Sequence, residues 1–419
     1  MPRILLIGTA DTKSAELLYL RERIAAAGGV ARVMDVGVMA PADFTPDIDH
    51  AQVACAGGTD ISALRTCGDE NTAMVAMARG AVAIVREQYR QGRMDGVLIL
   101  GGSMGTDLAL DVAAALPLGV PKVVLSTIAH SHLIAPERIT PDLTMMLWTG
   151  GLYGLSSLSR ATLSQAAGAV VGACRVAEPP RFERPLIGMT SFGKTCLRYM
   201  VPLKPALEAR GYEVAVFHTT GMGGRAFESL AEQRAFAAVF DFSLQEIGNH
   251  LGGSCVSAGP DRLRAAGRAG VPQIVAPGAI DLIDFPAWGA VPAGFEGRPS
   301  HEHNRLIASA TLDGPARRLV AGEIAARLAE AVGPTQLLLP LGGVHAWDLP
   351  GEPLHDAPAL VAMLDVLQTR AEALGVPCRT VPAHINDAVF IEAALDVFDT
   401  WVAQGLVPAG RPALWEKAA

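Results

Sequence analysis

The feature that most constrains the fold is a strand–turn–helix pattern that recurs along the chain. A short apolar run leads into a turn rich in glycine, threonine or aspartate, and then into a stretch with helical periodicity. The clearest examples are residues 4–14, 97–107 and 217–228. Strands that alternate with helices form a parallel sheet covered on both faces, and ligands bind at the carboxyl ends of its strands. The pattern therefore predicts an α/β fold with a polar cleft at that edge.

The expected elements fall into two halves. In the first half we expect strands at 3–8, 31–38, 96–100 and 121–126, and helices at 13–27, 72–91, 107–116 and 155–174. In the second half we expect strands at 186–189, 213–217, 238–242, 272–276, 336–340 and 379–381, and helices at 203–210, 225–236, 243–251, 315–331, 357–374 and 387–404. The polar segment 176–184 holds Pro179 and Pro180, so we place a domain boundary there. The domains expected are residues 1–178 and 185–419, and residues 283–304 are expected to form a long loop over the cleft.

Composition narrows the class of protein. A chain of 419 residues with 50% hydrophobic residues can bury one or two full cores. The net charge of −8, without a Lys/Arg cluster, argues against nucleic acid and against an anionic membrane as partners. The six cysteines are scattered, which fits a reducing compartment. With no targeting segment and no apolar stretch of membrane-spanning length, we expect a cytoplasmic protein.

Two glycine-rich turns of the first half are candidate nucleotide loops. Residues 101–106 place three glycines and two hydroxyls at a helix start, where backbone amides face an anion. Residues 8–14 add hydroxyl and carboxylate groups that suit a ribose, a phosphate or a magnesium shell, although Asp11 or Thr12 could instead cap the helix. The residues assigned to cofactor binding are Gly8, Thr9, Asp11, Thr12, Lys13, Gly101, Gly102, Ser103, Gly105 and Thr106.

The turn at residues 217–228 is a candidate anion site in the second half. His218 and Arg225 bracket a glycine-rich segment whose amides can face a ligand, and the alternative is a tight turn without one. A second segment, residues 188–195, matches the P-loop pattern G-x-x-x-x-G-K-[ST]. Prolines at 202 and 205 interrupt the helix that a P-loop needs, so the P-loop is the less favoured alternative, and an anion contact by Lys194 and Thr195 stays open.

Acidic and histidine side chains of the second half gather in predicted loops and at strand ends. They are Asp241, Glu246, Asp281, Asp284, His301, His303, His345, Asp348, His384 and Asp387. His345 with Asp348 is a candidate general base with an orienting carboxylate, and helix capping by Asp348 is the alternative. The pair His301 and His303 is either a metal pair or a structural one, so the metal ligands stay unknown. No cysteine lies in a turn beside a histidine, which argues against a cysteine nucleophile.

An ordered series of motifs gives the chain a family resemblance. GTADTKSAE, GGSMGTD, LGVPKVVLST, SFGKT, FHTTGMGGRAFESL, DFSLQEI, SAGPDRLRAA, PGAIDLIDF, HEHN, LPLGGVHAWDLPG and HINDAVF occur in this order. Together they resemble the bacterial and plant family typified by the ATP-binding region of the tomato mosaic virus resistance protein, from Gly8 to about Phe390. The resemblance implies two consecutive Rossmann-like doubly wound domains, ATP as the ligand, and self-association into a homo-oligomer.

Family positions carry over residue by residue. The nucleotide loops match residues 8–13 and 101–106, and the cleft-lining segments match 217–228, 257–262 and 301–304. The chain departs from the family pattern at three places: Lys194 replaces a hydrophobic residue, Arg305 replaces a proline, and residues 309–314 lack an Arg-Thr-Thr and acidic pattern. These departures concern the ligand geometry around residues 305–314.

The leading functional hypothesis is an ATP-binding enzyme that acts on a small acidic metabolite in a cleft between the two domains. Mg²⁺ would neutralise phosphate charge, and the catalytic candidates are His218, Arg225, His303, His345 and Asp348. One alternative is an ATP-independent hydrolase or lyase with His345 and Asp348 as base and orienter and the amides of 221–224 as an oxyanion site. The other is a nucleotide-responsive binding protein without turnover.

Overall fold

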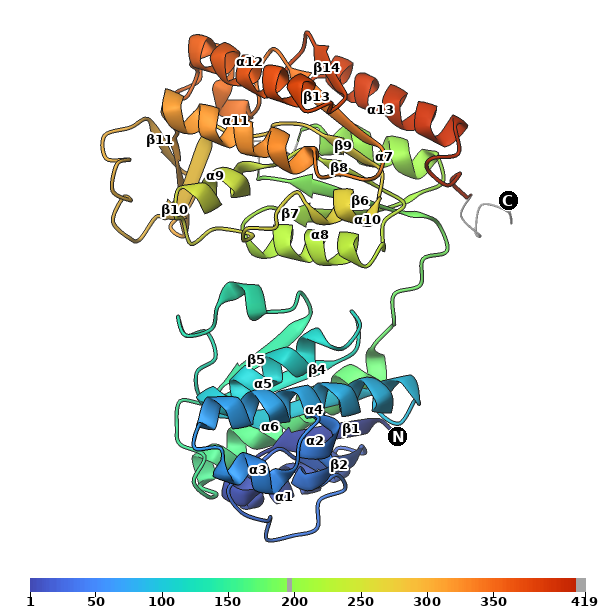
Figure 1. The fold of residues 1–419 in the computed structure, drawn as a ribbon, viewed down its shortest axis with the longest axis vertical. Helices are drawn as coiled ribbons and strands as arrows, with labels where there is room; N and C mark the ends of the chain where they lie inside the picture. Colours follow the sequence, from blue (N-terminus) through green and yellow to red (C-terminus); the bar gives the residue numbers. More distant parts are fainter. Residues whose placement is uncertain (194–197, 412–419) are drawn as a thin grey trace. The chain divides into compact units, whose positions relative to one another are not determined.

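The computed structural model describes residues 1–193 and 198–411 and divides the chain into two compact units. The first unit is Met1–Arg181 and the second is Phe182–Ala419 (Figure 1). The division falls inside the polar segment 176–184, where the backbone forms neither helix nor strand after Val176. Each unit has its own sheet and its own cores.

The first unit is built on a five-stranded parallel sheet with the order β2-β1-β3-β4-β5. Its strands are β1 (Arg3–Gly8), β2 (Val30–Asp35), β3 (Gly96–Gly101), β4 (Lys122–Ser126) and β5 (Leu143–Leu147). Its helices are α1 (Ala10–Ala26), α2 (His50–Ala56), α3 (Ile61–Thr66), α4 (Glu70–Arg90), α5 (Ser103–Ala114) and α6 (Ser157–Val176), with a 3-10 turn η1 (Pro136–Arg138).

Strand β1 shows how the apolar runs make two layers. Leu5 and Ile7 pack into the core under α2, α4 and α5, whereas Ile4 and Leu6 pack into the core under α1 and α6. Because successive side chains of a strand point to opposite faces, a strand buried on both sides needs an uninterrupted apolar run. The first unit is therefore doubly wound, as the sequence predicts.

The second unit contains a six-stranded parallel sheet with the order β14-β13-β9-β8-β6-β7. Its strands are β6 (Leu186–Ser191), β7 (Glu213–His218), β8 (Ala238–Asp241), β9 (Gln273–Val275), β13 (Thr335–Pro340) and β14 (Cys378–Val381). Its helices are α7 (Met200–Ala209), α8 (Met222–Glu232), α9 (Gln245–Leu251), α10 (Ala265–Ala269), α11 (Gly314–Leu328), α12 (Ala357–Ala373) and α13 (Ala388–Ala403), with a 3-10 turn η2 (Ala346–Asp348).

Helices also cover both faces of this second sheet. Leu203 of α7 and Phe390 of α13 share one core, while Val320 of α11 and Leu364 of α12 share another. The two parallel sheets confirm the predicted α/β class (Figure 1).

Several regions differ from the prediction, and the short helices α2, α3 and α10 are among the elements that it lacks. The expected loop 283–304 instead contributes β10 (Leu282–Pro286) and β11 (Ser300–Glu302) to a small antiparallel sheet completed by β12 (Ile307–Thr311), in the order β10-β12-β11. Its pairing of strands is set by contacts with β12, which the Pro- and Gly-rich composition does not reveal. Strand β5 was also missed, because this edge strand is only partly buried and lacks a long apolar run.

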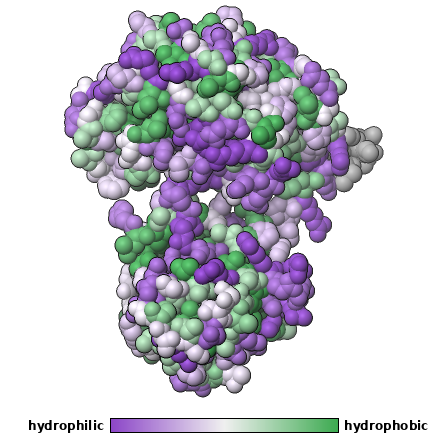
Figure 2. Space-filling view, in the orientation of Figure 1, coloured by the Kyte–Doolittle hydropathy of each residue, from purple (hydrophilic) through white to green (hydrophobic). Residues whose placement is uncertain are grey.

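Polar and apolar side chains mix over the visible surface of both units (Figure 2). Within the described residues, no helix is long and apolar enough to cross a membrane.

Candidate functional site

A cavity of about 730 Å³ lies in the first unit, next to the carboxyl ends of β1 and β3. Most of the residues assigned to cofactor binding line it: Thr9, Asp11, Thr12, Lys13, Gly101, Gly102, Ser103 and Gly105. The two glycine-rich turns, far apart in the sequence, are neighbours because β1 and β3 are adjacent strands. This size is within the range of small-ligand sites.

The rest of the wall combines an apolar part with charged side chains. Val36, Val38, Leu64, Ala73 and Met74 provide apolar surface, and Arg65, Asp69 and Glu70 provide charge. A mostly apolar pocket with a few placed polar groups is the common form of a small-molecule site.

The amino-terminal end of α5 is open to this cavity. Gly102 is its N-cap residue and, having no side chain, leaves the first amides of the helix without a side-chain cap. Its φ of −76° is accessible to any residue, and a Cβ there would lie 3.8 Å from Thr127 Oγ1, its nearest neighbour. The missing side chain is therefore not explained by backbone strain or packing within the protein. Unpaired amides and the helix dipole favour an anion at this point.

Two of the assigned residues do not line the cavity and are corrected. Gly8 ends β1 and pairs with Asp35, and a Cβ on it would lie 3.0 Å from Leu17. Thr106 is buried, and its hydroxyl bonds the carbonyl of Gly102 and the hydroxyl of Ser126. Both residues support the turns by packing rather than by contact with a ligand.

The start of α1 differs from that of α5 because the protein supplies its own anion. The buried Asp35 carboxylate accepts the amides of Ala10 and Gly37, both at 2.8 Å. In dinucleotide-binding folds an acid in the corresponding region binds the ribose instead. Asp11 does not cap the helix, since its carboxylate accepts the amide of Met39 at 3.0 Å.

Hydroxyl and ammonium groups complete this side of the cavity. Thr9 Oγ1 and Thr12 Oγ1 are 2.9 Å apart, and Lys13 Nζ donates to Thr12 Oγ1 at 3.1 Å. These groups are exposed and face the same space as the α5 terminus. They can bind the oxygens of a phosphate or a sugar.

Sequence reasoning missed a series of side-chain contacts, here called the relay, that runs from Arg65 in the cavity wall through His50 to Asp35. Arg65 donates from Nε to the Val38 carbonyl at 2.8 Å, and its terminal nitrogen lies 3.4 Å from His50 Nε2. His50 Nδ1 lies 3.2 Å from Asp35 Oδ2. The only hint in the sequence is that Asp35 follows the apolar run of β2.

In the second unit the turn at residues 221–224 holds a carboxylate of the protein. The Gly221 amide donates to Glu246 Oε1 at 2.6 Å, and a Cβ on Gly224 would lie 1.9 Å from Glu246 Oε2. Gly221 adopts a φ of 87°, which favours glycine. The expected oxyanion site is therefore corrected, because Glu246 already occupies the amide of Gly221.

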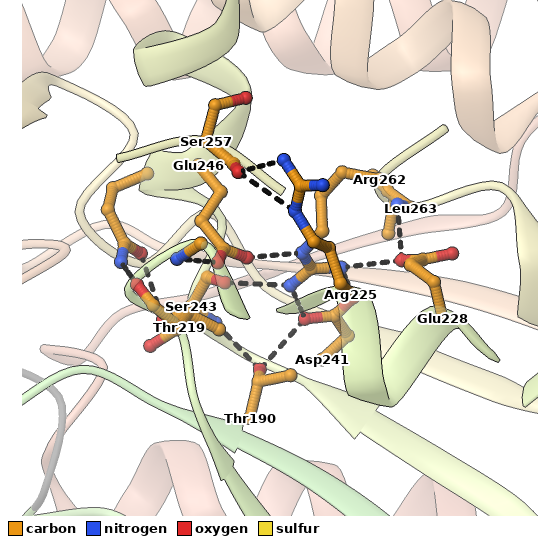
Figure 3. Close-up of polar contacts among 12 residues, drawn as sticks. Thr190, Thr219, Arg225, Glu228, Asp241, Ser243, Glu246, Ser257, Arg262 and Leu263 are labelled. Carbon is orange, nitrogen blue, oxygen red and sulfur yellow. Dashed lines mark hydrogen bonds and ion pairs between the residues drawn. The ribbon is translucent and has the colours of Figure 1, made fainter. Parts of the chain in front are cut away.

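Glu246 belongs to a buried ionic network around Arg262, shown in Figure 3. The Arg262 guanidinium donates to Glu246 at 2.8 Å, Glu228 at 2.9 Å and Asp241 at 2.5–2.6 Å. Burial raises the pKa of Glu246 to about 7 and also raises the pKa of Glu228. Arg262 thus links carboxylates of β8, α8 and α9, and each of these groups has hydrogen-bond partners within the protein.

Arg225 and His218 lie at the edge of this network. The Arg225 guanidinium donates to the Ser257 carbonyl at 2.8 and 3.2 Å (Figure 3). His218 is exposed and stacks on Phe192, with ring centroids 6.2 Å apart. Burial of part of the ring and the nearby His303 lower the pKa of His218, which keeps it neutral at pH 7.

The structure corrects the pairing proposed for His345. Its Nε2 lies 3.2 Å from Asp281 Oδ1, whereas Asp348 accepts the amide of Val344 at 2.9 Å. His345 is fully buried, so a substrate does not reach it in this conformation. Asp348 therefore stabilises the loop, and burial raises its pKa to about 6.

The remaining sequence hypotheses concern metals and the P-loop. The ring of His301 packs against Trp347 in a tilted contact, with ring centroids 4.1 Å apart. The described residues contain no group of three or more His, Cys, Asp or Glu arranged to hold a metal. Gly188 lies inside β6, paired with Ala215 and Val239, so it is not a loop glycine as a P-loop requires. Lys194 and Thr195 lie outside the described residues.

Comparison with known proteins gives full-length matches. The model described as "Uncharacterised protein family (UPF0261) N-terminal domain" matches residues 2–179, and the corresponding C-terminal domain matches residues 184–402. A UPF0261 protein of Brucella melitensis biotype 1 is 54% identical over 412 residues, covering 98% of each chain. The ToMV resistance protein Tm-1(GCR237) of Solanum lycopersicum is 30% identical over 435 residues, covering 95% of this chain and 55% of the tomato protein.

Solved structures match only distantly. The glycosyltransferase SsfS6 of Streptomyces sp. SF2575, complexed with thymidine diphosphate, is 14% identical with a TM-score of 0.21, covering 94% of this chain and 100% of that one. MnaA of S. aureus with UDP is 8% identical with a TM-score of 0.21, covering 99% and 100%. Likeness at this level carries no functional argument.

Proposed function

The chain belongs to the UPF0261 family, which confirms the resemblance stated from its motifs, and we propose that its first unit binds a nucleotide, with ATP as the leading ligand. The observation that carries the proposal is the open start of α5 at Gly102, which faces a cavity of about 730 Å³. Backbone amides at the starts of α1 and α8 already donate to the carboxylates of Asp35 and Glu246. The start of α5 has no such side-chain partner, so it is available to a phosphate.

The chemistry of the walls supports an orientation for the ligand. Phosphate oxygens fit the amides of 102–105, the hydroxyls of Thr9 and Thr12, and Lys13. The base fits the apolar side of the cavity, lined by Val38 among others. This arrangement favours a mononucleotide over a dinucleotide, because Asp35, the residue suited to a ribose contact, is buried and bonded to the protein.

Magnesium belongs to the proposal only as a companion of the phosphates. No described group of three or more acidic, histidine or cysteine side chains is arranged to hold a metal, so the protein residues do not fit a metal site of their own. Any Mg²⁺ would enter bound to the triphosphate oxygens.

The catalytic part of the proposal concerns a small acidic metabolite. His218 and His303 are exposed, and His218 is neutral at pH 7, as a general base must be. Arg225 is a cation on the same unit, held by Ser257. His345 and Asp348 leave the list of candidates because they are buried.

The test is isothermal titration of the full chain with ATP, ADP, GTP and NAD⁺, each with and without Mg²⁺. We expect saturable binding of ATP and none of NAD⁺. Equal binding of NAD⁺ would contradict the mononucleotide assignment, and no binding of any nucleotide would refute the proposed function. Nucleotide turnover measured with a panel of organic acids then separates an enzyme from a binding protein.

A further inference from the structure

The relay holds Arg65 in one orientation in the wall of the cavity. Its Nε donates to the Val38 carbonyl at 2.8 Å, and its Nη2 lies 3.4 Å from His50 Nε2. An arginine side chain can only donate hydrogen bonds, so His50 Nε2 is the acceptor. His50 is held in turn, because its Nδ1 lies 3.2 Å from a carboxylate oxygen of the buried Asp35. The guanidinium is therefore positioned by the segment after β2 and by the start of α2.

These contacts use one edge of the guanidinium and leave another open. The N–H of Nε and the neighbouring N–H of Nη2 form the edge that Val38 and His50 accept from. The edge between Nη1 and Nη2 offers two further N–H groups, in the geometry that binds two oxygens of one phosphate. In the described part of the chain Arg65 has no other hydrogen bond and no ion pair with a carboxylate. This open edge favours an anionic group of the ligand.

The acids of the cavity wall do not neutralise this cation. Asp69 is the N-cap of α4 and accepts backbone amides there, and Asp11 accepts the amide of Met39. Glu70 is exposed, so solvent and salt screen its charge. The positive charge of Arg65 therefore remains available to a ligand.

The position of Arg65 indicates which part of a nucleotide it would contact. The open start of α5 follows β3, whereas Arg65 is bonded to Val38 after β2, and β1 lies between these two strands. With neighbouring strands about 4.8 Å apart, the ends of β2 and β3 are roughly 10 Å apart. Arg65 is thus on the Val38 side, where the base and its ribose fit. In dinucleotide-binding folds an arginine in this region binds a phosphate on the ribose.

We propose that Arg65 selects a nucleotide whose ribose carries a second phosphate, in addition to the 5′-phosphate held at the start of α5. The inference rests on the proposed nucleotide site and narrows its ligand to a class, the adenosine 2′,5′- and 3′,5′-bisphosphates and their derivatives. ATP shares the adenosine and the 5′-phosphate with this class and lacks only the group that Arg65 binds. Because the relay already orients the guanidinium, little side-chain freedom is lost when the second phosphate binds.

The experiment compares ligands that differ only in where the second phosphate is attached. ADP, adenosine 2′,5′-bisphosphate and adenosine 3′,5′-bisphosphate are isomers, so their composition is the same. Their Kd for the full chain is measured by titration calorimetry, with and without Mg²⁺. We expect one of the two bisphosphates to bind about tenfold more tightly than ADP, on the scale of a bidentate charge-assisted contact.

The variant Arg65→Gln removes the guanidinium and should lose most of this tenfold preference while the Kd of ADP changes little. The matched control is Arg86→Gln, which removes the same charge from an exposed position of α4, about 24 Å along the helix from Glu70. This control should keep the preference. Thermal unfolding of both variants without ligand checks that each remains folded.

Three results would overturn the role of Arg65 and leave the nucleotide site standing. They are equal or weaker binding of both bisphosphates relative to ADP, an unchanged preference in Arg65→Gln, and an equal loss for ADP and the bisphosphates in Arg65→Gln. The last result would place the 5′-phosphates, rather than a ribose phosphate, at Arg65. Absence of binding by every nucleotide would instead refute the proposed function.

Discussion

Gly102 is the residue at which a ligand role and a packing role separate most cleanly. Its backbone suits any residue, and a side chain would enter open space in the cavity. Gly102→Leu is therefore expected to fold with little loss of stability and to abolish ATP binding, because the leucine occupies the place of a phosphate. Calorimetric titration and thermal unfolding of the variant measure both effects.

The matched control for Gly102→Leu is Gly168→Leu. Gly168 is exposed on α6, and a Cβ there has no neighbour within 4 Å. This variant should keep full ATP affinity. Retained binding in Gly102→Leu, or an equal loss in both variants, would argue that the start of α5 does not hold the ligand.

Asp284 offers a prediction about pH. It is fully buried, bonded to Asn249 and Ser309, and burial raises its pKa from 3.8 to about 6. The folded state therefore keeps a proton that the unfolded chain has already lost, so this group costs stability as the pH rises from about 4 to 6. Asp284→Asn retains both bonds without the charge and should be more stable at pH 8, by up to about 3 kcal/mol.

Urea unfolding of the natural chain and of Asp284→Asn at pH 4.5 and pH 8 checks this sign. The gain should be small at the lower pH and reach its full value above pH 6. A variant that is less stable at pH 8 would show that the ionised carboxylate contributes to the fold.

At the scale of elements, the start of α8 depends on the close approach of Glu246, which accepts the Gly221 amide. A Cβ on Gly224 would lie 1.9 Å from a carboxylate oxygen whose position is fixed by Arg262. We expect Gly224→Ala to lower the free energy of unfolding by about 1–3 kcal/mol through overpacking. Gly168→Ala, on an exposed helix face, should instead be neutral or stabilise by up to about 1 kcal/mol. Denaturant titration compares the two, and equal effects would contradict this account of the turn.

The helices and strands were predictable where a single local pattern, such as an apolar run, was sufficient to identify them. Strand β1 is an apolar run buried on both faces, and its bounds agree with the prediction. The β10-β12-β11 sheet was missed because its strands are short and defined by their partners. The glycine-rich turns were also predictable, because each is marked by residues that are neighbours in the sequence. The sequence could not distinguish the open start of α5 from the start of α8, where Glu246 accepts a backbone amide.

The relay and the burial of His345 were beyond sequence reasoning for a different reason. They depend on which distant side chains meet: His50 with Asp35, and His345 with Asp281 rather than Asp348. His345 and Asp348 are close in sequence, which favoured them as a pair, but in the folded chain His345 contacts Asp281 instead. The convergence of polar strand ends was predictable, but the individual partners were not.

At the scale of the molecule, the chain passes from the first unit to the second through the polar segment around Arg181, which is exposed, and Arg184, which is half-buried. Limited trypsin digestion should cut first after Arg181, because the backbone there forms neither helix nor strand and is accessible, whereas Arg184 precedes a proline and resists trypsin. Two stable fragments of about the size of the units are expected on a gel. Early cleavage elsewhere, for example after the exposed Arg305 that precedes β12, would contradict the assignment of this segment as the weakest connection.

The central claim is that a nucleotide binds within the first unit at the start of α5. Hydrogen–deuterium exchange of the full chain, with and without saturating Mg·ATP, tests it most directly by locating the amides that the ligand protects. We predict slower exchange at residues 9–13, 36–39, 64–74 and 101–106, with the amides after Gly102 protected most. Protection confined to the turn at residues 221–224, or to any segment of the second unit, would contradict the account.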